Sequence, residues 1–358
     1  MGRGGGAVLA AIAVIFAVAW LWRSHVGGDV PMDERHQSAA SEKSAPAASV
    51  VLSINASKAS PAQPIAPAAS ASAVGKEFAT AKGLKPLYDR LSAQGSAATP
   101  DAKYYLYRIL SRCATRTDKA GDTRLDTVAA QRARLEALIP ATSRDRAKRL
   151  ALFDESMHRC DGMETVTTTQ ADLEKLLADA VAGGDPKARA LVTSRELATG
   201  SAVPGPGGTG GPSMSDVQLR TLEEAIASRD PEAIFIAGIT LSSTFRDVVP
   251  EIGPNHDELQ GRAAAEAWSL VACEYGLECG AGSRLLQNPC IYSGQCASTT
   301  VQDQTFFYGT TPYEAQLLDQ YRQVFRNAVA NNDWSGITFA RRPNTSSNRY
   351  MFGTPMPP

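Results

Sequence analysis

The cysteines of this chain have a number and a spacing that could support metal binding or disulfide formation. The last four of the six cysteines follow the spacing C-x5-C-x10-C-x5-C, and the set comprises Cys113, Cys160, Cys273, Cys279, Cys290 and Cys296. This spacing matches a zinc site poorly, because the cluster holds no C-x2-C pair and no histidine. An even number of cysteines is typical of disulfides in an exported chain. We therefore predict disulfides and an oxidising compartment.

The pairing of these cysteines can be predicted in part. Cys113 and Cys160 each follow an apparent helix, in Ser-Arg-Cys and His-Arg-Cys, and we expect them to pair. Within the cluster, the local pairs Cys273–Cys279 and Cys290–Cys296 are favoured over a nested arrangement, although spacing alone leaves both open.

Histidine is scarce, and only one of the four lies where a site is expected. His25 and His36 fall near the N-terminus, and His158 stands beside Cys160 at the end of an apparent helix. His256 lies in a loop next to Asp257 and Glu258, where acid–base or metal chemistry is conceivable, although such a histidine is usually solvated. No H-E-x-x-H, G-x-S-x-G or P-loop motif occurs. The sequence predicts no catalytic, cofactor-binding or metal-ligating residue and favours a protein that is not an enzyme.

One glycine motif imitates a dinucleotide site. Gly205 to Gly210 reads G-x-G-x-x-G, but no β-type run precedes it and the prolines Pro204, Pro206 and Pro212 interrupt it. The fingerprint works only between a strand and a helix. We interpret this stretch as a flexible linker.

The N-terminal segment indicates export. The run from Ala7 to Trp22 has no charged side chain and spans roughly 24 Å as a helix. Arg3 and Arg23 flank it, and the short basic N-terminus is expected to stay in the cytoplasm. Trp20, Trp22 and Arg23 favour an uncleaved anchor through residues 7–22, with the body in the periplasm on a single-pass inner-membrane protein.

A cleaved signal peptide remains the alternative for this segment. Ala17-Val18-Ala19 has the small-x-small form of a cleavage site, and cleavage after Ala19 would give a periplasmic or secreted protein. The charge balance, with 36 Lys+Arg against 37 Asp+Glu, argues against a nucleic-acid partner.

The rest of the chain must position these residues, and it is expected to be mainly α-helical. We expect antiparallel helical hairpins in two halves, with a disulfide-stapled C-terminal part. The expected segments are an anchor or signal segment (1–26), a disordered Ala/Ser/Pro spacer (27–75), a helical domain (76–200), a Gly/Pro linker (201–214), a second helical domain with the cysteine cluster (215–335) and a loose tail (336–358).

Local signals mark several helix starts. Capping boxes are expected at Thr169, Ser215 and Thr311, where the third residue onward is Asp, Gln or Glu. No stretch before Ile291 shows sustained alternation of β-branched residues. Residues 305–308 (TFFY) and 334–339 (WSGITF) could form short strands or apolar loops.

The sequence pattern of one predicted helical hairpin occurs more than once. The pattern Leu-x-x-Ala-(Val/Ile)-x-x-x-Asp-Pro-x-Ala occupies 177–188 and, without gaps, 222–233. Each copy predicts a helix, a turn and a second helix that Asp caps and Pro begins. A fainter copy of the helix start, Thr-Pro-Asp-Ala, lies at 99–102. Two unrelated hairpins that share common capping chemistry would give the same pattern.

This pattern resembles tetratricopeptide-like short helical repeats, in which a turn of the form G-D-x-x-A links two helices, as in Gly184-Asp185-Pro-Lys-Ala188. The resemblance covers about residues 76–245 and lacks a strict period. It implies an α-helical scaffold that binds other proteins, and it implies no chemistry.

Three functions follow from these observations. The favoured one is a membrane-tethered extracytoplasmic scaffold that binds a protein partner in a bacterial-type cell envelope. The others are a cell-envelope enzyme with its site near His256 and a structural accessory without a tight ligand.

Overall fold

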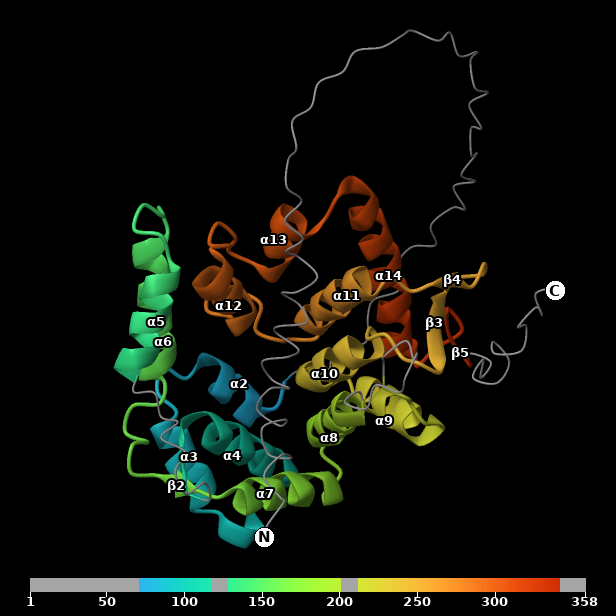
Figure 1. The fold of residues 1–358 in the computed structure, drawn as a ribbon. Helices are drawn as coiled ribbons and strands as arrows, with labels where there is room; N and C mark the ends of the chain where they lie inside the picture. Colours follow the sequence, from blue (N-terminus) through green and yellow to red (C-terminus); the bar gives the residue numbers. More distant parts are fainter. Residues whose placement is uncertain (1–70, 118–127, 201–211, 342–358) are drawn as a thin grey trace, which may run out of the picture. The chain divides into compact units, whose positions relative to one another are not determined.

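The computed structural model describes residues 71–117, 128–200 and 212–341 (Figure 1). The described residues all belong to one compact unit. In the described ranges, no helix has both the length and the apolar character needed to cross a membrane. The expected anchor at 7–22, and the G-x-G-x-x-G stretch at 205–210, lie outside these ranges, so both interpretations stay predictions.

The described chain is mainly helical, as expected. The helices before the linker are α2 (Ala73–Thr80), α3 (Lys85–Ser92), α4 (Pro100–Cys113), α5 (Val128–Leu138), α6 (Arg146–His158), α7 (Gln170–Ala182) and α8 (Pro186–Gly200), with a short 3-10 turn η1 (Gly95–Ala97). Those after it are α9 (Asp216–Ala227), α10 (Pro231–Leu241), α11 (Gly261–Glu274), α12 (Arg284–Ser293), α13 (Val301–Gln304) and α14 (Pro312–Asn331), with the π-helix η2 (Thr305–Gly309).

The helix starts follow from local capping chemistry. Thr169, Ser215 and Thr311 each form the predicted capping box, in which cap and third residue exchange hydrogen bonds. Asp185 and Asp230 accept backbone N–H groups at the starts of α8 and α10. These bonds satisfy donors that a helix start otherwise leaves open.

The two turns that precede α8 and α10 each contain one residue with a positive φ angle. Gly184 and Arg229 stand at the same position of the repeated pattern, and their φ angles are 82° and 60°. After α7, the N–H of Asp185 donates to Ala180 O at 3.0 Å and that of Gly184 to Val181 O at 2.9 Å. This is a Schellman ending, which requires the left-handed residue. Arg229 keeps that conformation as a non-glycine residue while its guanidinium binds carbonyls at the end of α14.

A small antiparallel sheet includes part of the stretch 334–339, where a short strand or an apolar loop was expected, but its other strands were not expected. Strand β3 (Val248–Ile252) pairs with β4 (Asp257–Glu258) on one side and with β5 (Ile337–Arg341) on the other. Two further short strands, β1 (Thr115–Arg116) and β2 (Thr167–Thr168), pair in parallel. The expectation of no strand before Ile291 was therefore wrong, because β3 alternates over only five residues and depends on a partner far along the chain.

The two ends of the described body also differ from the expected boundaries. Helix α2 begins at Ala73, inside the expected spacer, because Ser72 caps it. Residues 337–341 form β5 instead of starting the loose tail. Residues 305–309 form η2, neither a strand nor a loop.

Two hydrophobic cores meet at α8. One core is built by α2, α3, α4 and α7 and includes Ala188. The other includes Ala190 and Leu197 of the same helix and is built by α9, α10, α11 and α14. At its centre, the buried Trp268 stacks on Phe325 with a distance of 4.1 Å between ring centroids. Thus α8 contributes to both halves.

All six cysteines form disulfides. The pairs are Cys113–Cys160, Cys273–Cys279 and Cys290–Cys296, which are the pairs that the sequence favoured. The first joins the end of α4 to the turn after α6. The other two hold the segments before and after α12.

Candidate functional site

An open hollow lies where the second stapled loop meets α13 and η2. The disulfide Cys290–Cys296 closes the turn after α12, and the chain then runs directly into the wall of the hollow. The N–H of Val301 donates to Cys279 O at 3.0 Å, so the segment held by the disulfide Cys273–Cys279 supports the same wall. The cysteine cluster therefore fixes the frame of this site.

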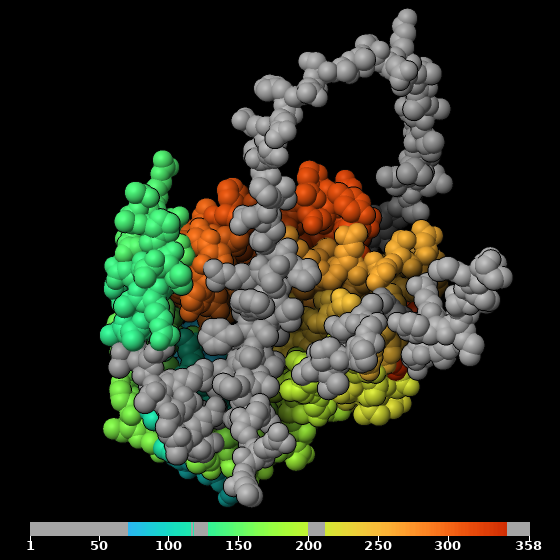
Figure 2. Space-filling view, in the orientation of Figure 1, coloured from blue at the N-terminus to red at the C-terminus, as the bar shows by residue number. Residues whose placement is uncertain are grey.

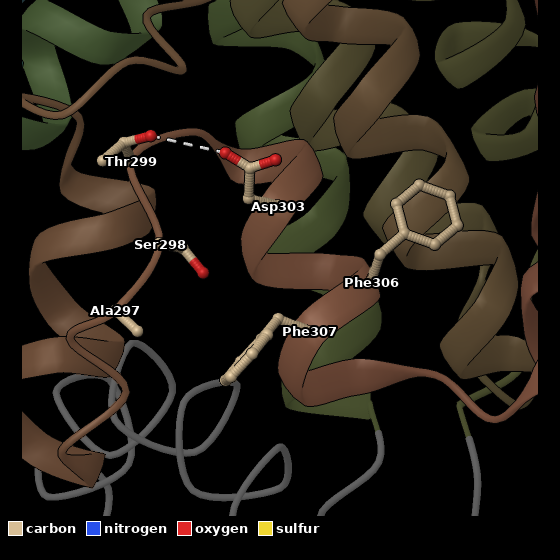
Figure 3. A pocket seen from close by; sticks show the side chains of 6 residues that line it. All are labelled: Ala297, Ser298, Thr299, Asp303, Phe306 and Phe307. Carbon is tan, nitrogen blue, oxygen red and sulfur yellow. Dashed lines mark hydrogen bonds between the residues drawn. The ribbon is translucent and has the colours of Figure 1, made fainter.

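Six residues line the hollow, whose volume is about 470 Å3: Ala297, Ser298, Thr299, Asp303, Phe306 and Phe307 (Figure 3). In Figure 3, Ala297, Ser298 and Phe307 face the open space, whereas Phe306 points to the other side of η2. There Phe306 packs on the C-terminal core. Phe306 thus anchors η2 to the core, whereas Phe307 faces solvent.

The polar groups of the hollow are partly unpaired. Thr299 Oγ1 donates to Asp303 Oδ2 at 3.4 Å, and the N–H of Asp303 donates to Thr300 Oγ1 at 3.0 Å. Ser298 Oγ is buried and makes no hydrogen bond. A buried hydroxyl without a partner costs free energy.

The apolar side of the hollow is exposed to a degree that is unusual for phenylalanine. Phe307 is 72% exposed. The C-terminal segments that carry the hollow are coloured orange and red in Figure 2. The ring of Phe307 packs edge to face against the ring of Tyr308, with 4.7 Å between the two ring centroids. Tyr308 in turn accepts a hydrogen bond from the N–H of Ala297 at 3.2 Å. The exposed ring is therefore held by a neighbour that is itself bound to the opposite wall. π-helical turns occur frequently at functional sites.

His256 does not belong to this hollow. It is exposed beside the β3–β4 turn, and its Nδ1 lies 3.1 Å from Glu251 Oε2 and 3.2 Å from Thr338 Oγ1. Asp257 and Glu258 are exposed on β4. His158 is likewise exposed, 3.0 Å from Asp161. Across the described ranges, no three His, Cys, Asp or Glu side chains gather closely enough to hold a metal ion.

A buried ionic network joins the repeated hairpins. Lys187 at the start of α8 is buried, and its Nζ contacts Asp101 at 2.9 Å, Asp185 at 2.9 Å and Asp230 at 3.2 Å. The rings of Tyr104 and Tyr105 lie within 5.5 Å of the same nitrogen.

A second acidic residue extends the network to α10. Glu232 accepts hydrogen bonds from Tyr104 and Tyr105, each at 3.0 Å, and pairs with Arg108. The starts of α4, α8 and α10 therefore meet at one group of charges. Their partial positive ends favour the excess of carboxylates there.

The electrostatics of this network point to a structural role. Burial opposes the charge of Lys187, but the carboxylates of Asp230, Asp185 and Asp101 outweigh that effect and raise its pKa above the ordinary value. A lysine that acts as a base or nucleophile needs the opposite shift. Burial also raises the pKa of Asp185, although the neighbouring Lys187 acts against it. We conclude that Lys187 keeps its positive charge and links the hairpins through its ion pairs.

Comparisons with known proteins add no assignment. The chain matches no family model, and the searches of curated proteins and of solved structures found no match either. The case for function therefore depends on the geometry described above.

Sequence reasoning missed Ser298, Asp303 and Phe307. The available signal was the aromatic run at 305–308, which we expected to form a strand or an apolar loop. A second signal was its position after the turn that the disulfide Cys290–Cys296 closes.

Proposed function

We propose that the chain is a membrane-tethered, extracytoplasmic helical scaffold of a bacterial-type cell envelope, and that it binds a protein partner at the hollow beside Phe307. The observation that carries the proposal is the combination in one small site of an exposed aromatic ring and a buried, unpaired hydroxyl. Neither feature stabilises the isolated chain.

The chemistry of the hollow suits an extended peptide segment. An apolar side chain of the partner would cover the ring of Phe307, and burying a phenylalanine contributes about 1.5–3 kcal/mol. A backbone or side-chain group beside it would pair with Ser298 Oγ. Aromatic residues at the centre of a site that excludes water dominate the energy of many protein interfaces.

The tether and the compartment have separate support. The three disulfides fit an oxidising environment outside the cytoplasm. The apolar run at 7–22 supplies the expected anchor, and the Ala/Ser/Pro-rich composition of 27–75 is typical of a spacer. Cleavage after Ala19 would leave the same partner site on a free protein.

Site-specific crosslinking tests the docking point. A photoreactive phenylalanine analogue replaces Phe307 in the full chain, and the matched control carries it at Leu138 on α5, which is 74% exposed. We expect a discrete crosslinked partner from position 307 only, and we expect Ser298→Ala to reduce its yield. Equal patterns from both positions, or no discrete product from 307, would contradict the proposal.

The tether needs its own measurement. Mass spectrometry of the mature N-terminus, together with alkaline extraction of membranes, distinguishes an anchored chain from one cleaved after Ala19. A chain that keeps residues 7–22 and yet is released by alkaline extraction would rule out the anchor.

A further inference from the structure

The two edges of the small antiparallel sheet differ in how they are protected. Strand β3 lies between β4 and β5, so β4 and β5 form the edges (Figure 1). Strand β4 consists of Asp257 and Glu258 alone, and its shortness and its charge both discourage pairing with a further strand. Strand β5 has five residues, Ile-Thr-Phe-Ala-Arg, of which the first four are uncharged and none is proline. The β5 edge thus lacks the features that block pairing.

The register of the sheet shows which backbone groups of β5 point away from β3. The N–H of Gly253 donates to Gly336 O at 3.0 Å, which marks a hydrogen-bonded pair where the two strands begin to run together. Bonded and non-bonded pairs alternate along an antiparallel ladder, so every second residue of β5 points its N–H and C=O to β3. The others point theirs to the outer edge, and they are Ile337, Phe339 and Arg341.

Most of these outward groups are unpaired. The N–H of Ile337 donates to Trp334 O in the turn before the strand. The C=O of Ile337, the N–H and C=O of Phe339 and the N–H of Arg341 make no hydrogen bond within the ranges that the structure describes. No helix in these ranges lies alongside β5, and the side chains of Thr338 and Arg341 are exposed. The outer edge of β5 is therefore a surface that another chain can reach.

The two faces of β5 suit a strand placed beside it. Ile337 is buried and Phe339 packs on the C-terminal core, so one face of the edge is apolar. On the other face, Thr338 and Ala340 are small and uncharged. A strand that pairs with β5 would cover the half-buried ring of Phe339 and would bring no charge against a like charge on the opposite face.

The two ends of β5 carry opposite charges. Arg341 ends the strand, and its guanidinium pairs with Asp216 and Asp247 while the side chain stays 43% exposed. Asp333 stands just before the strand, is exposed and has no ion pair in the described part of the chain. An antiparallel copy of β5 would bring the basic end of each strand beside the acidic end of the other. The charges of the edge therefore complement those of a second copy.

We propose that two copies of the chain pair through β5 as a two-fold dimer centred on Phe339. In this register, the N–H of each Phe339 donates to the C=O of Phe339 in the other copy, and the N–H of each Arg341 donates to the C=O of Ile337 in the other copy. These bonds use the outward groups that each copy leaves unpaired. The two sheets join into one, and the two Phe339 rings become neighbours at the join.

Sedimentation velocity of the full oxidised chain in detergent micelles tests the dimer. Pairing along one five-residue edge buries less surface than the roughly 1,200–2,000 Å² of a stable interface. We therefore expect monomer and dimer to exchange reversibly over a series of protein concentrations. A monomer at every concentration overturns the proposal.

Arg341→Pro tests the hydrogen bonds of the edge. Proline removes the outward N–H and leaves the ladder with β3 intact, because an edge strand tolerates proline where its nitrogen faces outward. Arg341→Ala is the matched control, since both variants lose the ion pairs with Asp216 and Asp247. The dissociation constant of the dimer should be roughly tenfold or more higher in Arg341→Pro than in Arg341→Ala, because two hydrogen bonds are lost. Equal dimerisation of the two variants overturns the proposal.

Photocrosslinking identifies the occupant of the edge without changing the backbone. A photoreactive phenylalanine analogue replaces Thr338, which faces Ala340 of the second copy in the proposed register, in cells that produce the full chain. The control carries the analogue at Leu138, which is 74% exposed. We expect a product of twice the chain mass from position 338 only, joined to β5 of the second copy. A product with a different protein, or no discrete product, overturns the proposal.

Discussion

Lys187 Nζ on α8 lies 2.9 Å from Asp101 Oδ1 on α4, and the two residues stand at the same position of two copies of one helix-start motif. The third copy has Glu232 at this position, where it meets Tyr104, Tyr105 and Arg108. The copies thus differ in charge at the point where they meet. Three identical copies would place like charges together in a buried region, which is unfavourable.

Lys187→Met should destabilise the protein strongly. The change leaves Asp101, Asp185 and Asp230 without their shared cation, and breaking a buried ion pair from one side costs about 3–5 kcal/mol. Denaturant unfolding of the full chain measures the loss. Lys175→Met on α7, whose side chain is 75% exposed, is the control and should cost less than about 1 kcal/mol. Similar losses in both variants would show that the buried network adds nothing.

The three disulfides should differ in their contribution to stability. Cys113 and Cys160 are 47 residues apart, so the chain-entropy model gives about 4 kcal/mol for that bond. Cys290 and Cys296 are six apart, for which the same model gives about 2 kcal/mol. Paired Cys→Ser variants, unfolded in guanidinium without reductant, compare them. If removal of Cys290–Cys296 cost as much stability as removal of Cys113–Cys160, or more, the short disulfide would act by holding the hollow in position instead.

Gly238→Ala should disturb the C-terminal core. A Cβ atom at Gly238 would lie 2.4 Å from Cγ of the buried Trp268, which stacks on Phe325. Overpacking of this kind costs about 1–3 kcal/mol. Gly83→Ala, where a Cβ meets nothing within 4 Å, is the matched control. Thermal unfolding and near-ultraviolet circular dichroism of Trp268 record the effect, and an unchanged tryptophan signal would contradict it.

Glu266 should make stability depend on pH. Burial raises its pKa from 4.5 to about 7, with Arg262 acting against the shift and Glu314 adding to it. The folded state therefore holds the proton more tightly than the unfolded state. The resulting stability is fully present below pH 4.5 and is lost as pH rises through about 7, a change of roughly 3 kcal/mol.

Comparison with Glu266→Gln isolates that contribution. The amide cannot ionise, so this part of the decline between pH 4.5 and 7 should disappear from its unfolding curve. Glu174→Gln, at an exposed position on α7, should keep the decline of the wild type. A wild-type decline that persists in Glu266→Gln would assign it to other groups.

Local chemistry explains what the sequence could predict. Capping residues such as Thr169 and Ser215 act on their own helix, so helix starts follow from the local sequence. Spacing favoured the local cysteine pairs but did not decide between them and a nested arrangement. Strand β3 could not be predicted in this way, because Val248 pairs with Arg341 near the other end of the domain.

The candidate sites were hidden for a related reason. Ser298 and Phe307 line one hollow because the loop after Cys296 is bonded to η2, through the N–H of Ala297 and the hydroxyl of Tyr308. The exposure of Phe307 depends on the π-helical turn, which presents it opposite to Phe306. Tertiary packing determines both arrangements.

The sharing of α8 between two cores has a consequence for how the domain comes apart. In an extended array, each repeat contacts only its neighbours, and repeats can melt one after another. Here Ala188 belongs to one core and Leu197 to the other, on a single helix. Loss of α8 from either side removes support from both, so these two cores should melt cooperatively, in one transition.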